Sequence, residues 1–106
     1  MPILPRGIAQ HAELIREFNR LRNISVPGVV KWNYTLDNDW SGDPAIFFWV
    51  LLTDDASKPE KLRTATAAFM NLINNKVDLR GDWGLIPYFN FRSVSEQAKL
   101  RDEVYE

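Results

Sequence analysis

One stretch of this 106-residue chain limits its fold more than any other, because residues 45–52 are apolar at every position. A strand with one face in water alternates polar and apolar side chains, so an unbroken apolar run predicts a strand that is buried on both faces. A chain of this length supports one core. We therefore expect a single α+β domain over residues 1–106, in which the second face of this strand needs a cover that a partner could supply.

The periodicity of the rest of the chain predicts the element order α-β-β-α-β-α. The expected elements are a helix over 8–22, strands over 29–36 and 45–53, a helix from 57 to about 76, a short strand over 86–91 and a C-terminal helix that starts near 93. Strands joined by a short loop pair most simply as an antiparallel hairpin, and the long helix makes a crossover to the third strand. This order predicts a two-layer sandwich, a ferredoxin-like fragment, whose helices cover the face that holds Val30, Trp32 and Tyr34.

Two positions have the spacing of a helix-starting capping box, in which a Ser side chain and a Glu three residues later bond each other's backbone. They are Ser57 with Glu60, next to Pro59, and Ser93 with Glu96. We expect the long helix to begin at the first and the C-terminal helix at the second.

Composition narrows the function classes. The net charge is −1, with 13 basic residues scattered among 14 acidic ones, whereas nucleic-acid binders carry a basic stripe. The chain lacks cysteine, its longest apolar run is too short for a bilayer, and its first residues lack a secretory signal. These features predict a cytoplasmic protein that binds neither nucleic acid nor membrane and uses no cofactor.

An acidic loop precedes the apolar strand. Asp37, Asp39 and Ser41-Gly42 match the first half of an EF-hand calcium loop, but the twelfth position, which should be a bidentate Glu, is Phe48. Loops rich in Asp, Asn, Ser and Gly are common because these residues tolerate tight turns. We therefore expect no metal here. Asp37, Asp39 and Asp43 could instead form a negative patch for a basic partner.

Three further charged residues support an alternative function. Asp54 and Asp55 follow the apolar strand and resemble a paired-carboxylate site, although carboxylates there also suit the dipole of the following helix. Arg92 precedes a helix N-terminus, where it could contact an anion or pair with Glu96. A small enzyme or ligand-binding domain would use these residues together with the acidic loop 37–43.

The element order resembles split ferredoxin-like domains, including type II KH-like proteins such as ribosome-binding factor A. The Ala-x-Gly kink and the basic face of that family are missing here, so RNA binding does not follow. The segments 42–52 and 88–96 are also similar to a group of small bacterial α+β proteins, some of which are encoded beside HEPN-type partners, as toxin and antitoxin are. The resemblance implies a protein partner.

The sequence favours a non-enzymatic interaction module, either a homodimer or a binder of another bacterial protein. The doubly apolar strand and the aromatic residues (six Phe, four Trp and three Tyr) then need no catalytic group to explain them. The strand offers two alternating sets of side chains to such an interface. The predicted interface set is Ile46, Phe48, Val50 and Leu52, and the other set is Phe47, Trp49 and Leu51.

Overall fold

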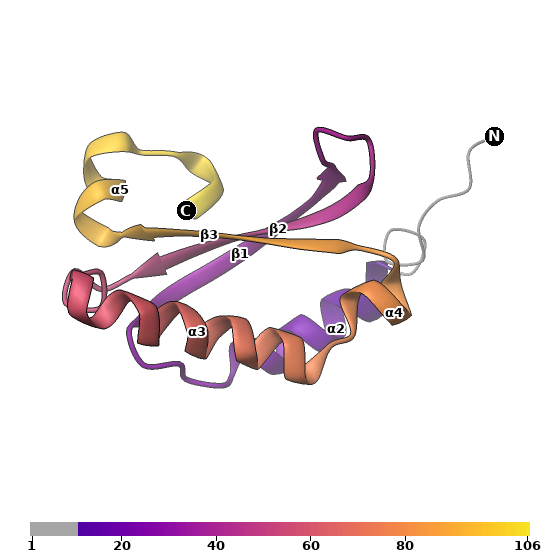
Figure 1. Cartoon of the computed structure of the whole chain (residues 1–106), viewed down its shortest axis with the longest axis horizontal. Coiled ribbons are helices and arrows are strands. Elements are labelled where there is room, and N and C mark those ends of the chain that lie inside the picture. The colour runs from indigo at the N-terminus through magenta and orange to yellow at the C-terminus, as the bar shows by residue number, and fades with distance from the viewer. Residues whose placement is uncertain (1–10) are drawn as a thin grey trace.

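The computed structural model describes residues 11–106, a mixed α+β fold built around a sheet with three strands in that part of the chain (Figure 1). Its elements are α2 (His11–Arg22), β1 (Val29–Asn38), β2 (Pro44–Leu52), α3 (Pro59–Lys76), α4 (Leu79–Trp83), β3 (Ile86–Ser93), α5 (Val94–Leu100) and a 3-10 turn, η1 (Glu103–Tyr105). The first residues of the expected helix, 8–10, and the first seven residues lie outside the described part.

The apolar strand β2 lies at the centre of the sheet, in the order β1-β2-β3. It pairs antiparallel with β1, as predicted for the hairpin, and parallel with β3, which the chain reaches through the crossover that contains α3. A central strand donates and accepts ladder hydrogen bonds on both sides. The most apolar segment of the chain therefore has no free edge.

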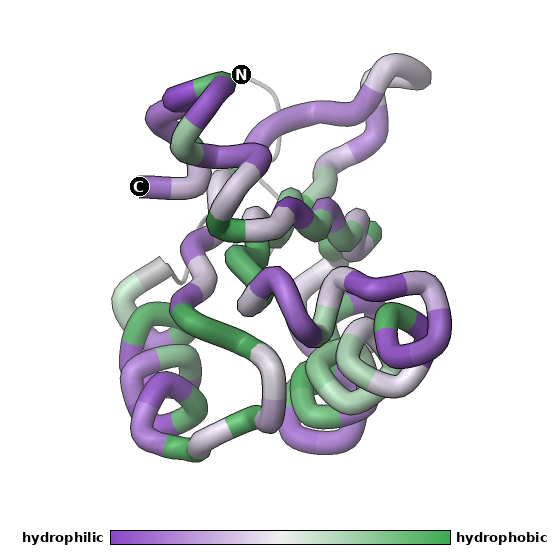
Figure 2. Tube along the Cα trace, turned by 90° about the vertical axis from the view of Figure 1, so that its left-hand side faces the viewer, coloured by the Kyte–Doolittle hydropathy of each residue, from purple (hydrophilic) through white to green (hydrophobic). Residues whose placement is uncertain are grey.

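Helices α2 and α3 lie side by side against one face of the sheet (Figure 2). Phe18 of α2 and Phe69 of α3 are fully buried there, and both contact the ring of Phe48 in β2, with ring centroids 5.7 and 5.9 Å apart. The ring of Trp32 in β1 packs edge-on against the rings of Phe18 and Phe69. These four aromatic residues belong to a larger apolar core and join the helical layer to the sheet.

The C-terminal segment, residues 94–106, lies on the opposite side of the sheet from α2 and α3 (Figure 1). It comprises α5 and η1, and η1 approaches both β1 and β2. The expectation of helices on one face therefore holds for α2 and α3, while α5 turns back over the other face. The capping box of Ser93 and Glu96 at the start of α5 is confirmed.

Two local expectations were wrong. Helix α3 begins at Pro59 after Lys58, which makes no side-chain cap, and Ser57 Oγ instead donates to the carbonyl of Thr53 at 3.0 Å. Val30 is 51% exposed because the pairing of β1 with β2 shifts between Val29 and Lys31, which takes Val30 out of the alternation that places Trp32 in the core.

Candidate functional site

The sheet face opposite α2 and α3, here called the open face, carries a row of aromatic side chains. The register places Thr35 of β1, Phe47 of β2 and Tyr88 of β3 side by side, and the next such row holds Asn33, Trp49 and Asn90. Paired residues point to the same face of a sheet, so both rows belong to the open face. The aromatic residues missing from the core are concentrated here.

The rings on the open face contact one another in a continuous series. Phe47 is stacked between Tyr88 and Trp49, with centroid distances of 5.2 and 6.2 Å. Trp40 of the hairpin loop lies 5.2 Å from Tyr88, and Tyr105 of η1 lies edge-on to Trp49 at 5.6 Å. The series therefore runs from the hairpin loop across the sheet to the C-terminal segment.

The indole of Trp49 is fixed on this face by a hydrogen bond. Its Nε1 donates to Thr35 Oγ1 at 3.0 Å. Phe47, Trp49, Tyr88 and Asn90 are all partly exposed, and Trp40 is 83% exposed. Aromatic rings that are held in place and remain partly exposed to solvent provide contact area that a partner could bury at little cost in side-chain entropy.

The hairpin loop, residues 39–43, borders one end of the open face and is organised by Asp39. Its Oδ1 accepts hydrogen bonds from Ser41 N, Ser41 Oγ and Asp43 N at 2.7–3.0 Å. Its Oδ2 accepts from the hydroxyl of Tyr88 at 2.7 Å, so the loop is tied to β3 across the sheet. Asp39 is only 8% exposed, and its predicted role in an acidic patch is wrong; Asp37 and Asp43 remain exposed.

These bonds shift the acidity of both partners. The hydrogen bonds from Ser41 and Tyr88 lower the pKa of Asp39 from 3.8 to about 2, because they stabilise the carboxylate. The same carboxylate raises the pKa of the Tyr88 hydroxyl, which keeps that group a donor. Asp39 is therefore an ionised structural anchor.

The C-terminal segment borders the other end of the open face, and Arg92 holds it in place. The guanidinium lies 4.3 Å from the centre of the Tyr105 ring, donates to Gln97 Oε1 at 3.1 Å and lies 3.7 Å from Asp102 Oδ2. Lys31 Nζ donates to the carbonyl of Glu106 at 2.7 Å. Arg92 thus already has partners within the chain, and the predicted pairing with Glu96 gives way to Asp102.

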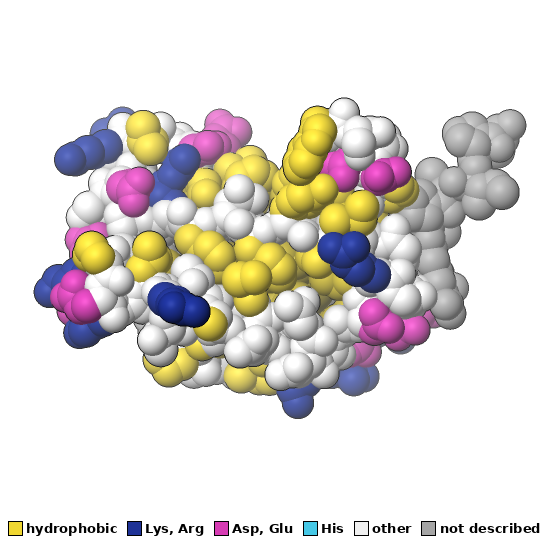
Figure 3. All heavy atoms as spheres, in the orientation of Figure 1, with side chains coloured by type: hydrophobic (Ala, Val, Ile, Leu, Met, Phe, Trp, Pro, Cys, Tyr) yellow, Lys and Arg dark blue, Asp and Glu magenta, His cyan; other side chains and the backbone are white. Residues whose placement is uncertain are grey.

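Between these two ends the molecular outline dips, with hydrophobic side chains showing at the dip (Figure 3). Ala45 at the loop end and Leu51 at the C-terminal end are buried, although both lie on the open face. Phe47 and Trp49 between them are not fully covered. The exposed part of the face is therefore a short stretch in the middle of β2.

The predicted interface set is corrected by this arrangement. Ile46, Phe48, Val50 and Leu52 are fully buried in the core beneath α2 and α3, so no partner can reach them in the folded chain. The alternating set on the same strand, Phe47, Trp49 and Leu51, faces the open side. Sequence reasoning missed Trp40 and Tyr88, which join this set only through the fold of the loop and the parallel pairing of β3.

The residues of the alternative ligand site do not come together. The loop 37–43 and Asp54 with Asp55 lie at opposite ends of β2. Asp54 accepts hydrogen bonds from the backbone and hydroxyl of Ser95, which lower its pKa, and Asp55 pairs with Lys61 at 2.8 Å, which lowers its own. Each carboxylate therefore has a separate structural partner.

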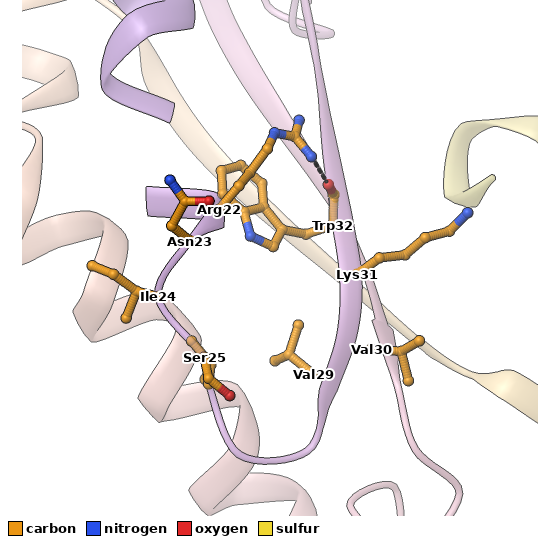
Figure 4. Close-up of a pocket in the computed structure, with 9 residues that line it drawn as sticks. Arg22, Asn23, Ile24, Ser25, Val29, Val30, Lys31 and Trp32 are labelled. Carbon is orange, nitrogen blue, oxygen red and sulfur yellow. Dashed lines mark hydrogen bonds between the residues drawn. The ribbon is translucent and has the colours of Figure 1, made fainter. Parts of the chain in front are cut away.

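A hollow of about 430 Å³ lies beside the start of β1, between that strand and the end of α2 (Figure 4). Arg22 lies over Trp32 at one border of the hollow, with its guanidinium 4.5 Å from the centre of the Trp32 ring and Nη1 donating to the carbonyl of Trp32 at 2.6 Å. Lys31 points away from it toward the C-terminal segment. The basic side chains that line the hollow thus already have partners.

Over residues 11–106, no three carboxylate or imidazole side chains gather as a metal site would require. In the same part of the chain, no helix has the length and apolar character to cross a membrane. No family of proteins, curated protein or solved structure matches the chain. The open face therefore remains the candidate functional surface of the described residues. The resemblances noted from sequence remain predictions.

Proposed function

We propose that this protein is a non-enzymatic interaction module that binds a protein through the open face of its sheet. The observation that carries the proposal is the series of contacting rings from Trp40 through Tyr88 and Phe47 to Trp49, held in place and left partly exposed. Aromatic residues in a rigid, partly desolvated setting carry much of the binding energy of protein interfaces.

The sheet supports this proposal because two rings of the series are fixed by hydrogen bonds. The hydroxyl of Tyr88 is bonded to Asp39, and the indole of Trp49 is bonded to Thr35. A preorganised surface loses little conformational entropy when it binds. The charged groups of Asp39 and Arg92 at its two borders are held by contacts within the chain, which fits a docking surface better than a reactive centre.

A binder selection tests the proposal. A displayed library of peptides and small domains is selected against the wild-type chain alone, and the affinity of each recovered clone for the double variant Trp40→Ala and Phe47→Ser is then measured. Most recovered clones should bind the wild type about tenfold more tightly than the double variant, since each lost aromatic contact costs a factor of that order. Self-association is measured separately by sedimentation velocity of both proteins.

The matched control is Leu62→Ala in α3, which removes an exposed apolar side chain from the opposite side of the molecule. This variant should bind the selected clones as the wild type does, and thermal unfolding should confirm that all three proteins fold. The proposal is wrong if most recovered clones bind the double variant as tightly as the wild type and lose affinity for Leu62→Ala, or if no clone depends on Trp40 and Phe47 and the chain remains monomeric at millimolar concentration.

A further inference from the structure

We propose that the occupant of the open face is a cationic amphipathic helix of another protein, lying across the strands between the hairpin loop and the C-terminal segment. This inference rests on the proposed function and names its partner class. Three properties of the face support it: the width of its exposed part, its rings and the carboxylates at its loop end.

The width of the exposed part selects a narrow partner. Phe47 and Trp49 lie between Ala45 and Leu51, which are covered by the chain itself. At about 3.3 Å per residue, the stretch from Ile46 to Val50 is about 13 Å long. A single helix with its side chains is about 10–12 Å across and fits this space.

A second copy of the chain fits less well. Its own hairpin loop and C-terminal segment also rise from its open face (Figure 1). Two such faces brought together would meet at these raised ends before Phe47 and Trp49 of each copy could touch. The rings are therefore more accessible to one element of a partner than to another sheet of the same shape.

The aromatic rings provide an apolar surface that complements the apolar stripe of such a helix. An amphipathic helix buries a stripe of apolar residues in a hydrophobic surface, which is a recurrent mode of peptide recognition. Phe47, Trp49 and Tyr88 form the floor for such a stripe, and Trp40 stands at its side.

The loop end provides negative charge that complements the basic residues of such a helix. Asp37 and Asp43 are exposed there. The C-terminal end is balanced, because the four carboxylates of residues 94–106 lie with Lys99 and Arg101 of the same segment and with Lys31 and Arg92. Lys31 contacts the main-chain carbonyl of Glu106, and Arg92 contacts the carboxylate of Asp102.

Lysine and arginine on one flank of a bound helix would meet Asp37 and Asp43 at the loop end, and Trp40 could receive one of them over its ring. A single-stranded nucleic acid could also stack on the rings, but its phosphates would face the same carboxylates. The charges therefore favour a cationic helix over a nucleic acid.

The test uses three synthetic peptides of equal length: a Leu/Lys amphipathic helix, the matching Leu/Glu helix and a Leu/Lys peptide of scrambled order. Binding is followed by amide and indole NMR shifts of the full chain. The Leu/Lys helix should bind and shift Phe47, Tyr88 and the indole protons of Trp40 and Trp49. Its affinity should fall about tenfold in the double variant Asp37→Asn and Asp43→Asn, and also on raising the salt concentration.

The control variant carries the same change of charge elsewhere, through Glu13→Gln and Asp82→Asn, which are exposed positions on helices α2 and α4. It should bind the Leu/Lys helix as the wild type does. Equal binding of the Leu/Glu or scrambled peptide, equal loss in the control variant, or tighter binding of an oligo-dT strand would each overturn the inference.

The result also separates this inference from the proposed function. If no peptide binds while the binder selection still yields clones that depend on Trp40 and Phe47, the partner class is wrong and the open face remains a docking surface. If the selection fails too, both are wrong.

Discussion

Asp39 shows how a single carboxylate links a loop to a sheet, and its acidity gives a measurable consequence. Its pKa is about 2 in the fold against an ordinary 3.8, so it contributes stability above the ordinary pKa, and that contribution is lost as the pH falls from about 4 toward 2. We expect Asp39→Asn to flatten the fall in stability over this range. Urea unfolding of both proteins between pH 5 and pH 2.5 measures it.

The lowered pKa values of Asp54 and Asp55 also add to the acid sensitivity of the wild type. The comparison with Asp39→Asn cancels their contributions because both proteins retain them. Parallel pH profiles for the two proteins would mean that the hydrogen bonds from Ser41 and Tyr88 do not favour the ionised carboxylate.

Phe48 and Trp49 are neighbours in sequence, yet their truncation should have different effects. Phe48 is fully buried and touches rings of α2, α3, β1 and β3, so Phe48→Ala should destabilise the fold by about 3–5 kcal/mol through lost burial and the cavity left behind. Trp49 is partly exposed, so Trp49→Ala should cost less. Chemical denaturation of both variants checks the order, and a larger loss for Trp49→Ala would contradict it.

The sequence could not indicate which of these two residues lies in the core. Every position of 45–52 is apolar, so the alternation that normally marks the buried face is absent. The prediction that the strand is buried on both faces holds for the core face, whereas on the open face Ala45 and Leu51 are buried and Phe47 and Trp49 are partly exposed. The choice of Ile46, Phe48, Val50 and Leu52 as the interface was wrong. Trp32 of β1 lies in the core and pairs with Val50, so this set also faces the core, but the pairing of these two residues is known only from the register of the strands.

At the scale of elements, the turn between α2 and β1 depends on Gly28. Its φ is +85°, and a Cβ there would lie 2.6 Å from the Cβ of Ala56, whereas Gly42 has a φ of +87° with open space around it. Gly42→Ala should lose about 1–2 kcal/mol from backbone strain alone. Gly28→Ala should lose clearly more, because Ala56 lies in the core and cannot move aside freely.

Thermal unfolding of the two glycine variants isolates the contact with Ala56, since both positions share the same backbone strain. Equal losses would mean that the turn can shift away from Ala56, and that the close approach of β1 to the loop after β2 does not constrain the fold.

Element boundaries were predictable where the signal was local and uncertain where it was not. The capping box of Ser93 with Glu96 forms as its spacing predicts, because both partners lie within one turn. Ser57 has the same spacing to Glu60, but its hydroxyl bonds to Thr53 in the preceding turn, and the helix begins two residues later at Pro59. The bulge that exposes Val30 has no local signal, since it depends on the register with β2.

At the scale of the whole molecule, the C-terminal segment is a cover whose attachment can be tested. Tyr105 is buried against Trp49 and Arg92, so Tyr105→Ala should free this end and expose Leu51. We expect a loss of about 1–3 kcal/mol, since a buried ring at the edge of the fold is removed. Hydrogen exchange should quicken in residues 101–106 while the core amides of β2 stay protected.

Phe91→Ala on the core side of β3 would instead be expected to weaken protection throughout the sheet, because that ring packs against Phe69. If Tyr105→Ala quickened exchange in β2 as well, the C-terminal segment would be part of the cooperative core rather than a cover.

The α+β class and the order of the longer helices and strands could be predicted from sequence because hydrophobic periodicity marks each of them independently, whereas the five-residue helix α4 and the parallel pairing of β2 with β3 were not predicted. The position of α5 could not be predicted either, because its attachment depends on contacts between distant residues, such as Asp54 with Ser95. The open face is the joint product of that attachment and of the hairpin loop. The sequence therefore predicted only that the second face of residues 45–52 must be covered, without indicating which residues border it.

The central position of β2 has a further consequence for how the protein behaves before it folds. Residues 45–52 combine high apolar content with no charge and no proline, the signature of an aggregation-prone segment. In the folded chain both edges of this strand are paired, and the outer strands are interrupted by the bulge near Val30 and by Pro87. The hazard therefore exists only while α3 and β3 have yet to dock, so the yield on refolding should fall steeply with protein concentration although the folded protein stays dispersed.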